Sequence, residues 1–261
     1  MTLRRVLLAL AVSFFGCVAA AQATTFVNEN FDSYADTAAM EAVWTPSATG
    51  GTLDNALSFS PNNSAAHGGG GTNQRSDFGT VDATATENLV LTARIYDDAL
   101  VANDRITVGL RGGPFPLFEM GRYNSFDVPS GAGNTDTYGI RATLFSNGIS
   151  PGWVAFSDGG NAIPATEGWH TYQAIFSLSG LTVNLDLLSD GSIDHTLNFA
   201  GDGNLYGGFS DLRFGGPSNL SSAGGGANFD DIVLEMVAVP EPSGLWIAGI
   251  AAAAMMLVRR R

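Results

Sequence analysis

Apolar and polar residues alternate with a period of two along much of this chain. Between Leu89 and Ile95 the odd-numbered residues are apolar, and between Leu181 and Leu187 apolar residues again occupy every second position. Such alternation is typical of strands that bury one face. Less regular versions of the pattern predict further strands over residues 105–110, 138–145, 169–178, 193–199 and 228–237.

Turn-forming residues separate these stretches. Gly, Asn, Asp and Ser cluster at Ser157–Gly160, Ser189–Ser192 and Gly201–Asn204, which is hairpin spacing. Only Ala38–Val43 suggests a helix, and no repeat period is evident. Many short strands in one long domain predict an all-β, antiparallel two-sheet sandwich. The glycine runs at 68–71 and 224–226 are predicted to be surface loops.

The charge balance excludes two broad classes of protein. Twelve basic residues, all Arg, face 25 acidic residues in a chain of 261, and only 14% of residues are charged while 45% are hydrophobic. A disordered acidic polymer would have more charge and fewer apolar residues. A nucleic-acid binder would have a basic surface, so no nucleic-acid partner is expected. From Thr24 to Ala238, seven Arg and 24 acidic residues leave a formal charge of −17.

The first 23 residues have the organisation of a secretory signal peptide. Two arginines near the start precede an apolar run from Val6 to Ala21, and Ala21-Gln22-Ala23 predicts cleavage after Ala23. A lipoprotein signal ending at Gly16-Cys17 is the alternative, but Phe14 stands where that motif usually has Leu. Cys17 is the only cysteine, so cleavage would leave no thiolate for a metal site or a nucleophile.

The last 23 residues combine three features in order. Val239-Pro240-Glu241-Pro242 ends the predicted strands, Ser243–Val258 is uncharged and mostly apolar, and Arg259-Arg260-Arg261 closes the chain. Sixteen helical residues span about 24 Å, short of a hydrocarbon core of roughly 30 Å, but arginines can snorkel and bilayers can thin. The arginines predict a cytoplasmic end, with the main domain outside.

This tail resembles the PEP-CTERM sorting signal. Pro240, Glu241 and Pro242 match its motif, residues 243–258 its transmembrane helix and the terminal arginines its basic cluster. The resemblance implies export, an inner-membrane-tethered intermediate and processing by an exosortase. It also implies a final place at the cell surface or in the extracellular matrix, beside exopolysaccharide and biofilm. An ordinary C-terminal membrane anchor is the alternative.

The expected organisation of the whole chain is a signal peptide (1–23), a β-sandwich domain (24–238) and a sorting and anchor segment (239–261).

The middle domain resembles the concanavalin A-like, laminin-G-like jelly roll. The likeness lies in Glu29–Tyr34 with Trp44-Thr45, in Gly168–Tyr172 with its following strand, and in Asn228–Leu234. A galactose-binding-like jelly roll with a similar closing strand is the nearest rival. The concanavalin A-like resemblance implies that the first and last strands are neighbours.

Neighbouring first and last strands suggest a structural Ca²⁺ site. By alternation, Glu29 shares a face with Val27 and Phe31, and Asp230 shares one with Ile232, Leu234 and Met236. Both carboxylates would then face the core, where an unpaired charge is very costly. Ca²⁺ prefers oxygen ligands. The candidate ligands are Glu29, Asp32, Asp230 and Asp231, and the alternatives are an Arg partner, backbone hydrogen bonds or simple exposure.

Catalytic motifs are absent from the sequence. No Glu-x-Asp-x-x-Glu strand, Gly-x-Ser-x-Gly elbow or pair of metal-spaced histidines occurs. We therefore expect a non-enzymatic protein that binds extracellular polysaccharide. A polysaccharide hydrolase or lyase is one alternative, for which carboxylates, or His, Arg and Tyr, would gather in a deep groove. A purely structural matrix component is another.

Six aromatic residues are candidates for stacking on sugar rings, and most are expected in the core: Trp44, Phe118, Tyr123, Tyr138, Trp153 and Trp169. Tyr123 and Trp153 lie next to turns and are the predicted glycan-binding residues.

Overall fold

The computed structural model describes residues 23–100, 105–113, 116–127, 134–144, 153–201, 207–216 and 227–239. Residues 1–22 of the predicted signal peptide, the sorting segment from Pro240 onward and residues 224–226 lie outside these residues. Within the described part, no helix combines the length and the apolar character needed to cross a membrane.

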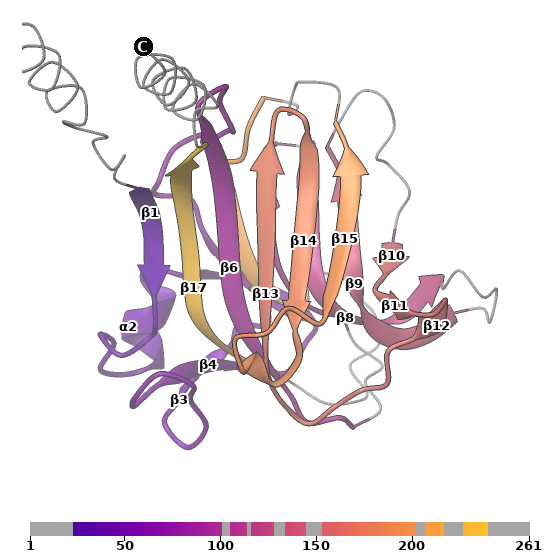
Figure 1. The fold of residues 1–261 in the computed structure, drawn as a ribbon. Helices are drawn as coiled ribbons and strands as arrows, with labels where there is room; N and C mark the ends of the chain where they lie inside the picture. Colours follow the sequence, from indigo (N-terminus) through magenta and orange to yellow (C-terminus); the bar gives the residue numbers. More distant parts are fainter. Residues whose placement is uncertain are drawn as a thin grey trace, which may run out of the picture.

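Eight of the described strands form the front sheet in Figure 1. Their order is β15-β14-β13-β6-β17-β4-β3, and β1 also pairs with β17. The bounds are β1 (Thr24–Glu29), β3 (Thr52–Asp54), β4 (Ser64–His67), β6 (Glu87–Asp97), β13 (Gly168–Ser177), β14 (Gly180–Asp186), β15 (His195–Ala200) and β17 (Ala227–Ala238). The pairing of β1 with β17 confirms that the first and last strands are neighbours.

Seven described strands form the back sheet, with β8 and β9 visible behind β13–β15 in Figure 1. Their order is β10-β9-β8-β7-β16-β5-β2. The bounds are β2 (Thr45–Ala48), β5 (Gly71–Arg75), β7 (Arg105–Arg111), β8 (Leu117–Asp127), β9 (Asn134–Thr143), β10 (Trp153–Ala155) and β16 (Asp211–Gly215). The remaining elements are a hairpin of β11 (Ser157–Asp158) and β12 (Asn161–Ala162), the short helix α2 (Thr37–Glu41) and the 3₁₀ turn η1 (Leu187–Ser189).

The core lies between the two sheets and follows the predicted alternation. Leu89, Leu91, Ala93 and Ile95 of β6 are all buried. Among the described residues, the largest side chains that are less than 2% exposed are ten aromatic ones: Phe31, Trp44, Phe118, Tyr138, Phe156, Tyr172, Phe176, Phe209, Phe214 and Phe229. The chain passes repeatedly from one sheet to the other, as in a jelly roll. The predicted fold class, an antiparallel two-sheet sandwich, is confirmed.

The glycine run at residues 68–71 is only partly the predicted surface loop, because residues 68–70 connect β4 to β5 and only Gly68 is exposed. Gly69 and Gly71 are buried, and Gly71 begins β5, where it pairs with Ala48 of β2. A Cβ atom on Gly71 would lie 2.5 Å from the Ser47 carbonyl oxygen and closer still to that of Thr49. The glycine is therefore needed for close approach of two backbones, a requirement that a run of glycines in the sequence does not reveal.

We expect Gly71→Ala to lower the free energy of unfolding by about 1–3 kcal/mol, because the new methyl group must displace backbone. Gly68→Ala is the matched control, since a Cβ there meets nothing within 4 Å, and it should change stability by less than about 0.5 kcal/mol. Urea unfolding of both variants measures the difference. Equal midpoints would show that β2 and β5 do not approach as described.

Candidate functional site

Glu29 is the centre of a buried group of hydrogen bonds at the end of β1. Its side chain faces the core, as predicted, and is 4% exposed. It accepts hydrogen bonds from Phe31 N at 2.8 Å, the Tyr34 hydroxyl at 2.6 Å and Trp44 Nε1 at 2.9 Å. Arg75 Nη1 lies 3.7 Å away. Burial, and then the Glu29 carboxylate, raise the pKa of Tyr34, which keeps its proton as a donor.

Asp230 does not face the core, because β17 contains a β-bulge. The pairing of β17 with β6 runs from Asp230 opposite Arg94 to Val233 opposite Thr92, so one extra residue is inserted between them. Asp231 lies in this bulge with φ +43°. The extra residue reverses the alternation, so the prediction that Asp230 shares a face with Ile232 is wrong.

A loop covers Asp230 on the outer face of the front sheet. We name residues 55–63 the strap. The Asp230 carboxylate accepts hydrogen bonds from Phe59 N and Ser60 N of the strap, at 2.8 and 2.9 Å, and from Asp231 N at 2.8 Å. Burial raises the pKa of Asp230 to about 6, although these donors act against the shift. At the other end of the strap, Asp32 accepts a hydrogen bond from Asn63 N at 2.9 Å.

The four candidate calcium ligands therefore bind protein groups separately. Asp231 pairs with Arg94 and accepts a hydrogen bond from the Ser60 hydroxyl. In the part of the chain that the structure describes, no three His, Cys, Asp or Glu residues gather as a metal site. The arginine partner and the backbone hydrogen bonds, the alternatives to calcium, are the arrangements observed for Glu29 and Asp230.

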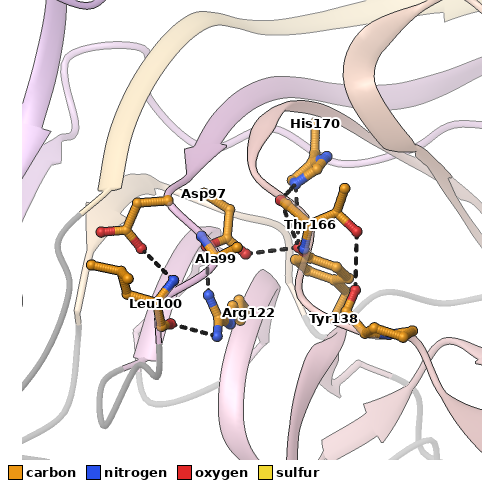
Figure 2. A network of polar contacts seen from close by, with 9 residues as sticks. Asp97, Ala99, Leu100, Arg122, Tyr138, Thr166 and His170 are labelled. Carbon is orange, nitrogen blue, oxygen red and sulfur yellow. Dashed lines mark hydrogen bonds and ion pairs between the residues drawn. The ribbon is translucent and has the colours of Figure 1, made fainter.

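A second buried polar group joins the two sheets at Asp97, the last residue of β6 (Figure 2). Asp97 of the front sheet accepts hydrogen bonds from Arg122 of β8 and, at 2.7 Å, from the Tyr138 hydroxyl of β9. Thr166 N donates to the same hydroxyl at 2.9 Å, and His170 Nε2 lies 2.8 Å from Thr166 O. We name Asp97, Arg122, Tyr138 and His170 the inter-sheet network.

The inter-sheet network contains the residue types of an acid–base site, and all of them are buried. Its four residues are at most 4% exposed, and none lines either of the two surface depressions described below. Burial lowers the pKa of His170 and raises that of Tyr138, so both side chains remain neutral near pH 7. The network has the properties of a structural connection between the sheets.

The outer face of the front sheet carries a depression. Strand pairing places Thr52, Ala66, Asn228, Tyr96 and Trp169 in one row across β3, β4, β17, β6 and β13. Ala66 is the small residue in this row, and a depression of about 400 Å³ lies over it. Its lining residues are Gly50, Thr52, Leu57, Ala66, His67, Gly68, Tyr96, Asp98, Ala227 and Asn228. Ligand sites typically have roughly 300–1,000 Å³.

Three aromatic side chains gather beside this depression. The Trp169 ring centroid lies 5.6 Å from that of Tyr96 and 6.0 Å from that of Phe59, both edge to face. Arg94 Cζ lies 3.8 Å from the Phe59 ring centroid. Phe59 is 41% exposed, and Tyr96 and Trp169 are half-buried. We name Phe59, Tyr96 and Trp169 the aromatic cluster; Tyr96 borders both the cluster and the depression.

Polar groups around the depression are held in fixed orientations. Asn228 Nδ2 donates to Asp54 Oδ2 at 2.8 Å, to Ser64 Oγ at 2.8 Å and to Leu57 O at 3.2 Å. These contacts orient the amide so that Oδ1 points away from those partners. The Tyr96 hydroxyl donates to Glu167 at 3.1 Å, and Asp98 accepts from Leu100 N at 2.9 Å.

The same outer face carries a row of uncharged polar side chains, separated from the row of Tyr96 and Trp169 by one that includes Arg94 and Asp186. Thr92, Gln173, Asn184 and Thr196 form one row across β6, β13, β14 and β15. Asn184 donates to Gln173 at 3.2 Å and accepts from Thr196 at 2.9 Å. A second depression of about 290 Å³ lies at one end of β14 and β15 and includes Thr182 and Asn198. We name the four-residue row the amide row.

Tyr123 and Trp153, the predicted glycan-binding residues, meet on the back sheet. Their rings stack with centroids 4.3 Å apart and an interplanar angle of 24°. Arg141 Cζ lies 5.5 Å from the Trp153 ring. Both side chains are half-buried against Ala155. The structure thus brings the two residues together, but each ring covers one face of the other.

Tyr96 and Phe59 are surface aromatics that the sequence reading above does not predict, and Trp169 stands there among residues expected mostly in the core. For Tyr96 and Trp169, the alternation of the sequence contains a signal. Leu91 and Ile95 occupy the core side of β6, which places Tyr96 on the polar side. Tyr172 and Phe176 likewise place Trp169 on the polar side of β13. Large aromatic residues on the polar side of an alternating strand are not explained by the core. No such pattern marks Phe59, which lies in the strap.

No protein-family model matches the chain, and no curated protein matches it in sequence. Among solved structures, it is similar to the exoplasmic/lumenal domain of VIP36 in its Ca²⁺/Man2-bound form, with 12% identity and a TM-score of 0.44 over 77% of this chain and 84% of that one. A GH54 α-L-arabinofuranosidase shows 11% identity and a TM-score of 0.42 over 68% of this chain, which spans only 38% of the enzyme.

The binding domain of botulinum neurotoxin serotype G shows 8% identity and a TM-score of 0.42, over 80% of this chain and 47% of that one. Similarities this weak carry no inference about ligands or activity.

We expect EDTA to leave the thermal unfolding midpoint of the purified protein unchanged, because protein donors occupy the carboxylates of Glu29 and Asp230. A melting curve with EDTA, compared with one in added Ca²⁺, measures this. A calcium-dependent rise of the midpoint would show that the ion binds the folded state and that these carboxylates have other partners in solution.

Proposed function

We propose that this chain is a non-enzymatic, carbohydrate-binding β-sandwich that is exported and sorted to the cell surface or extracellular matrix. The observation that supports sugar binding is the depression on the outer face of the front sheet, bordered by the aromatic cluster and by oriented polar groups. The proposed ligand is an extracellular polysaccharide.

The chemistry around the depression fits a pyranose ring. One side of a sugar ring is a patch of C–H groups that packs on an aromatic face, and the hydroxyl groups around it require hydrogen-bond partners. Tyr96 supplies the ring at the edge of the depression, while Asn228 Oδ1, Thr52 and Asp98 supply acceptors. Three hydrogen bonds hold the Asn228 amide in place, so little side-chain entropy would be lost on binding.

The amide row provides a continuation of the site for a longer chain of sugars. It begins at Thr92, two residues before Arg94 on β6, and crosses the sheet to Thr196 on β15. Its amides and hydroxyls already bond to one another, so the surface is ordered before ligand arrives. An uncharged hydrogen-bonding surface suits the successive hydroxyl groups of a polymer.

A polysaccharide hydrolase or lyase is the second candidate, and the inter-sheet network is the observation that favours it. Asp97, Arg122, Tyr138 and His170 are residue types that such enzymes need. Their burial between the sheets is the reason for placing this candidate second. Catalysis there would require the sandwich to open.

Export and sorting rest on the sequence of the two ends. The proposed partners are the membrane, through residues 243–258, and an exosortase acting at Pro240-Glu241-Pro242. Signal cleavage after Ala23 would release a chain that begins at Thr24, the first residue of β1. The sandwich ends at Ala238, directly before the segment that includes Val239 and the three terminal arginines, Arg259, Arg260 and Arg261.

We expect the wild-type chain, expressed in an exosortase-bearing Gram-negative host, to reach the surface or medium without its last residues. Replacing both Pro240 and Pro242 by Ala should leave the chain uncut in the inner membrane. Fractionation with mass spectrometry of the C-terminus measures both outcomes. A wild-type chain found in the cytosol with both ends intact would refute export, and a full-length chain in the membrane would indicate an ordinary anchor.

We expect Trp169→Ala to weaken binding to neutral polysaccharides roughly tenfold, the effect of losing one aromatic contact of about 1.4 kcal/mol. Trp153→Ala, which removes the same side chain from the back sheet, is the matched control and should bind as the wild type does. Affinity electrophoresis in gels containing each polymer measures the dissociation constants.

If Trp153→Ala loses binding and Trp169→Ala does not, the site lies on the back sheet at Tyr123 and Trp153. The same polymers, incubated with the protein, also test the second candidate. Release of reducing ends or unsaturated products would show turnover, and its loss in Tyr138→Phe would assign the reaction to the inter-sheet network.

A further inference from the structure

We propose that the site on the front sheet discriminates against anionic polysaccharides, and that Asp98 and Glu167 are the residues that set this specificity. The inference rests on the proposed function, since it concerns the charge of the glycan that the same depression would take. Its basis is an imbalance of charge around the depression and the aromatic cluster.

One carboxylate, Asp98, lines the depression, and two more, Asp54 and Glu167, accept hydrogen bonds from the lining side chains of Asn228 and Tyr96. The described partners of all three are neutral donors. Asp54 accepts from Ala56 N and from Asn228 Nδ2, both at 2.8 Å. Asp98 accepts from Leu100 N, and Glu167 accepts from the Tyr96 hydroxyl. Among the residues that the structure describes, none of the three forms an ion pair. Their charges are therefore not neutralised locally.

The nearest basic side chains do not compensate for these charges. Arg94 is engaged by Asp231 and lies over the Phe59 ring, so its charge is already paired. His67 lines the depression, but burial lowers its pKa to about 4, and it is neutral near pH 7. The other lining residues are uncharged except Asp98. The site therefore presents a net negative charge to a ligand.

This charge acts in opposite ways on the two chemical classes of polysaccharide. A sugar hydroxyl can donate to a carboxylate that has no cationic partner, and a hydrogen bond to a charged acceptor is stronger than one between neutral groups. A uronate carboxylate has no proton to donate and is repelled by the same groups. Carboxylates at this position therefore favour uncharged glycans by accepting hydrogen bonds from sugar hydroxyl groups. They disfavour anionic glycans by electrostatic repulsion.

The local effect of the carboxylates beside the depression can be distinguished from the repulsion that the whole acidic domain exerts on a polyanion. The formal charge of −17 between Thr24 and Ala238 repels any polyanion at long range, and removing one charge anywhere reduces it slightly. Only the carboxylates beside the depression lie within short range of a bound ligand. Asp158, an exposed carboxylate in the β11–β12 hairpin, serves as the matched control for net charge.

The test uses three neutral polymers, a β-glucan, a galactomannan and amylose, each with a partner whose primary alcohols have been oxidised to carboxylates. Affinity electrophoresis of the full chain at low salt gives the ratio of affinities for each pair. We expect the wild type to bind the neutral member at least tenfold more tightly. Asp98→Asn and Glu167→Gln should each shift this ratio severalfold toward the oxidised member, and Asp158→Asn should not.

The outcomes separate this inference from the proposed function. Wild-type protein that binds no neutral polymer refutes the proposed function and the inference with it. Equal or tighter binding of the oxidised member refutes the inference alone. A ratio that moves equally in Asp98→Asn and Asp158→Asn also refutes it, because net charge and not the site would then set the preference.

Discussion

One extra residue in β17 determines what the front sheet presents to solvent. Before the bulge at Asp231, Phe229 faces the core opposite Ile95, and Asp230 faces outward opposite Arg94. After the bulge, Ile232 and Leu234 return to the core. Without the insertion, one half of this central strand would place its apolar side chains in water. The bulge also supplies the attachment of the strap, because Asp230 and Asp231 together hold Phe59 and Ser60. The depression and the aromatic cluster both depend on that arrangement.

Two buried polar groups then hold the sheets in register. Glu29 receives three hydrogen bonds from the segment between β1 and β2 and lies 3.7 Å from Arg75 of β5. Asp97 connects β6 with β8 and β9. A buried ion pair adds little net stability, because desolvation offsets most of the attraction. Removing one partner is nonetheless costly, since it leaves the other charge buried and unpaired. The other contacts between the two sheets are hydrophobic and nondirectional, so they would tolerate a shift of one sheet over the other. The buried polar groups oppose such a shift, because it would separate their partners. The inter-sheet network is best understood as a device for sheet alignment.

The sequence predicted the parts of the fold that depend on local pattern. Leu89 to Ile95 gave the central strand and its core face, and Glu29 was correctly expected to be buried and to need a partner. Asp230 was assigned to the wrong face because a bulge leaves no mark in an alternation of apolar residues on either side of it. The pairing of Tyr96 with Asn228 and Trp169 depends on strand order, which is a property of the whole chain. The depression over Ala66 could not be predicted for the same reason, since its residues come from four separate strands.

Residues that the core does not require carry the strongest evidence about function. In an alternating strand, the inward positions are constrained by packing, and the outward positions need only remain soluble. Thr92 and Gln173 are polar and meet that requirement. Tyr96 and Trp169 are not explained by it, because exposed aromatic area is unfavourable in water. The two ring centroids lie 5.6 Å apart, and Tyr96 lines a depression together with Asp98, a carboxylate that forms no ion pair with the described residues. A purely structural matrix component would have no need for this combination on its solvent face. The placement of aromatic and acidic groups together, on the side of the sheet that stability leaves unconstrained, is the reason for proposing a binding surface there.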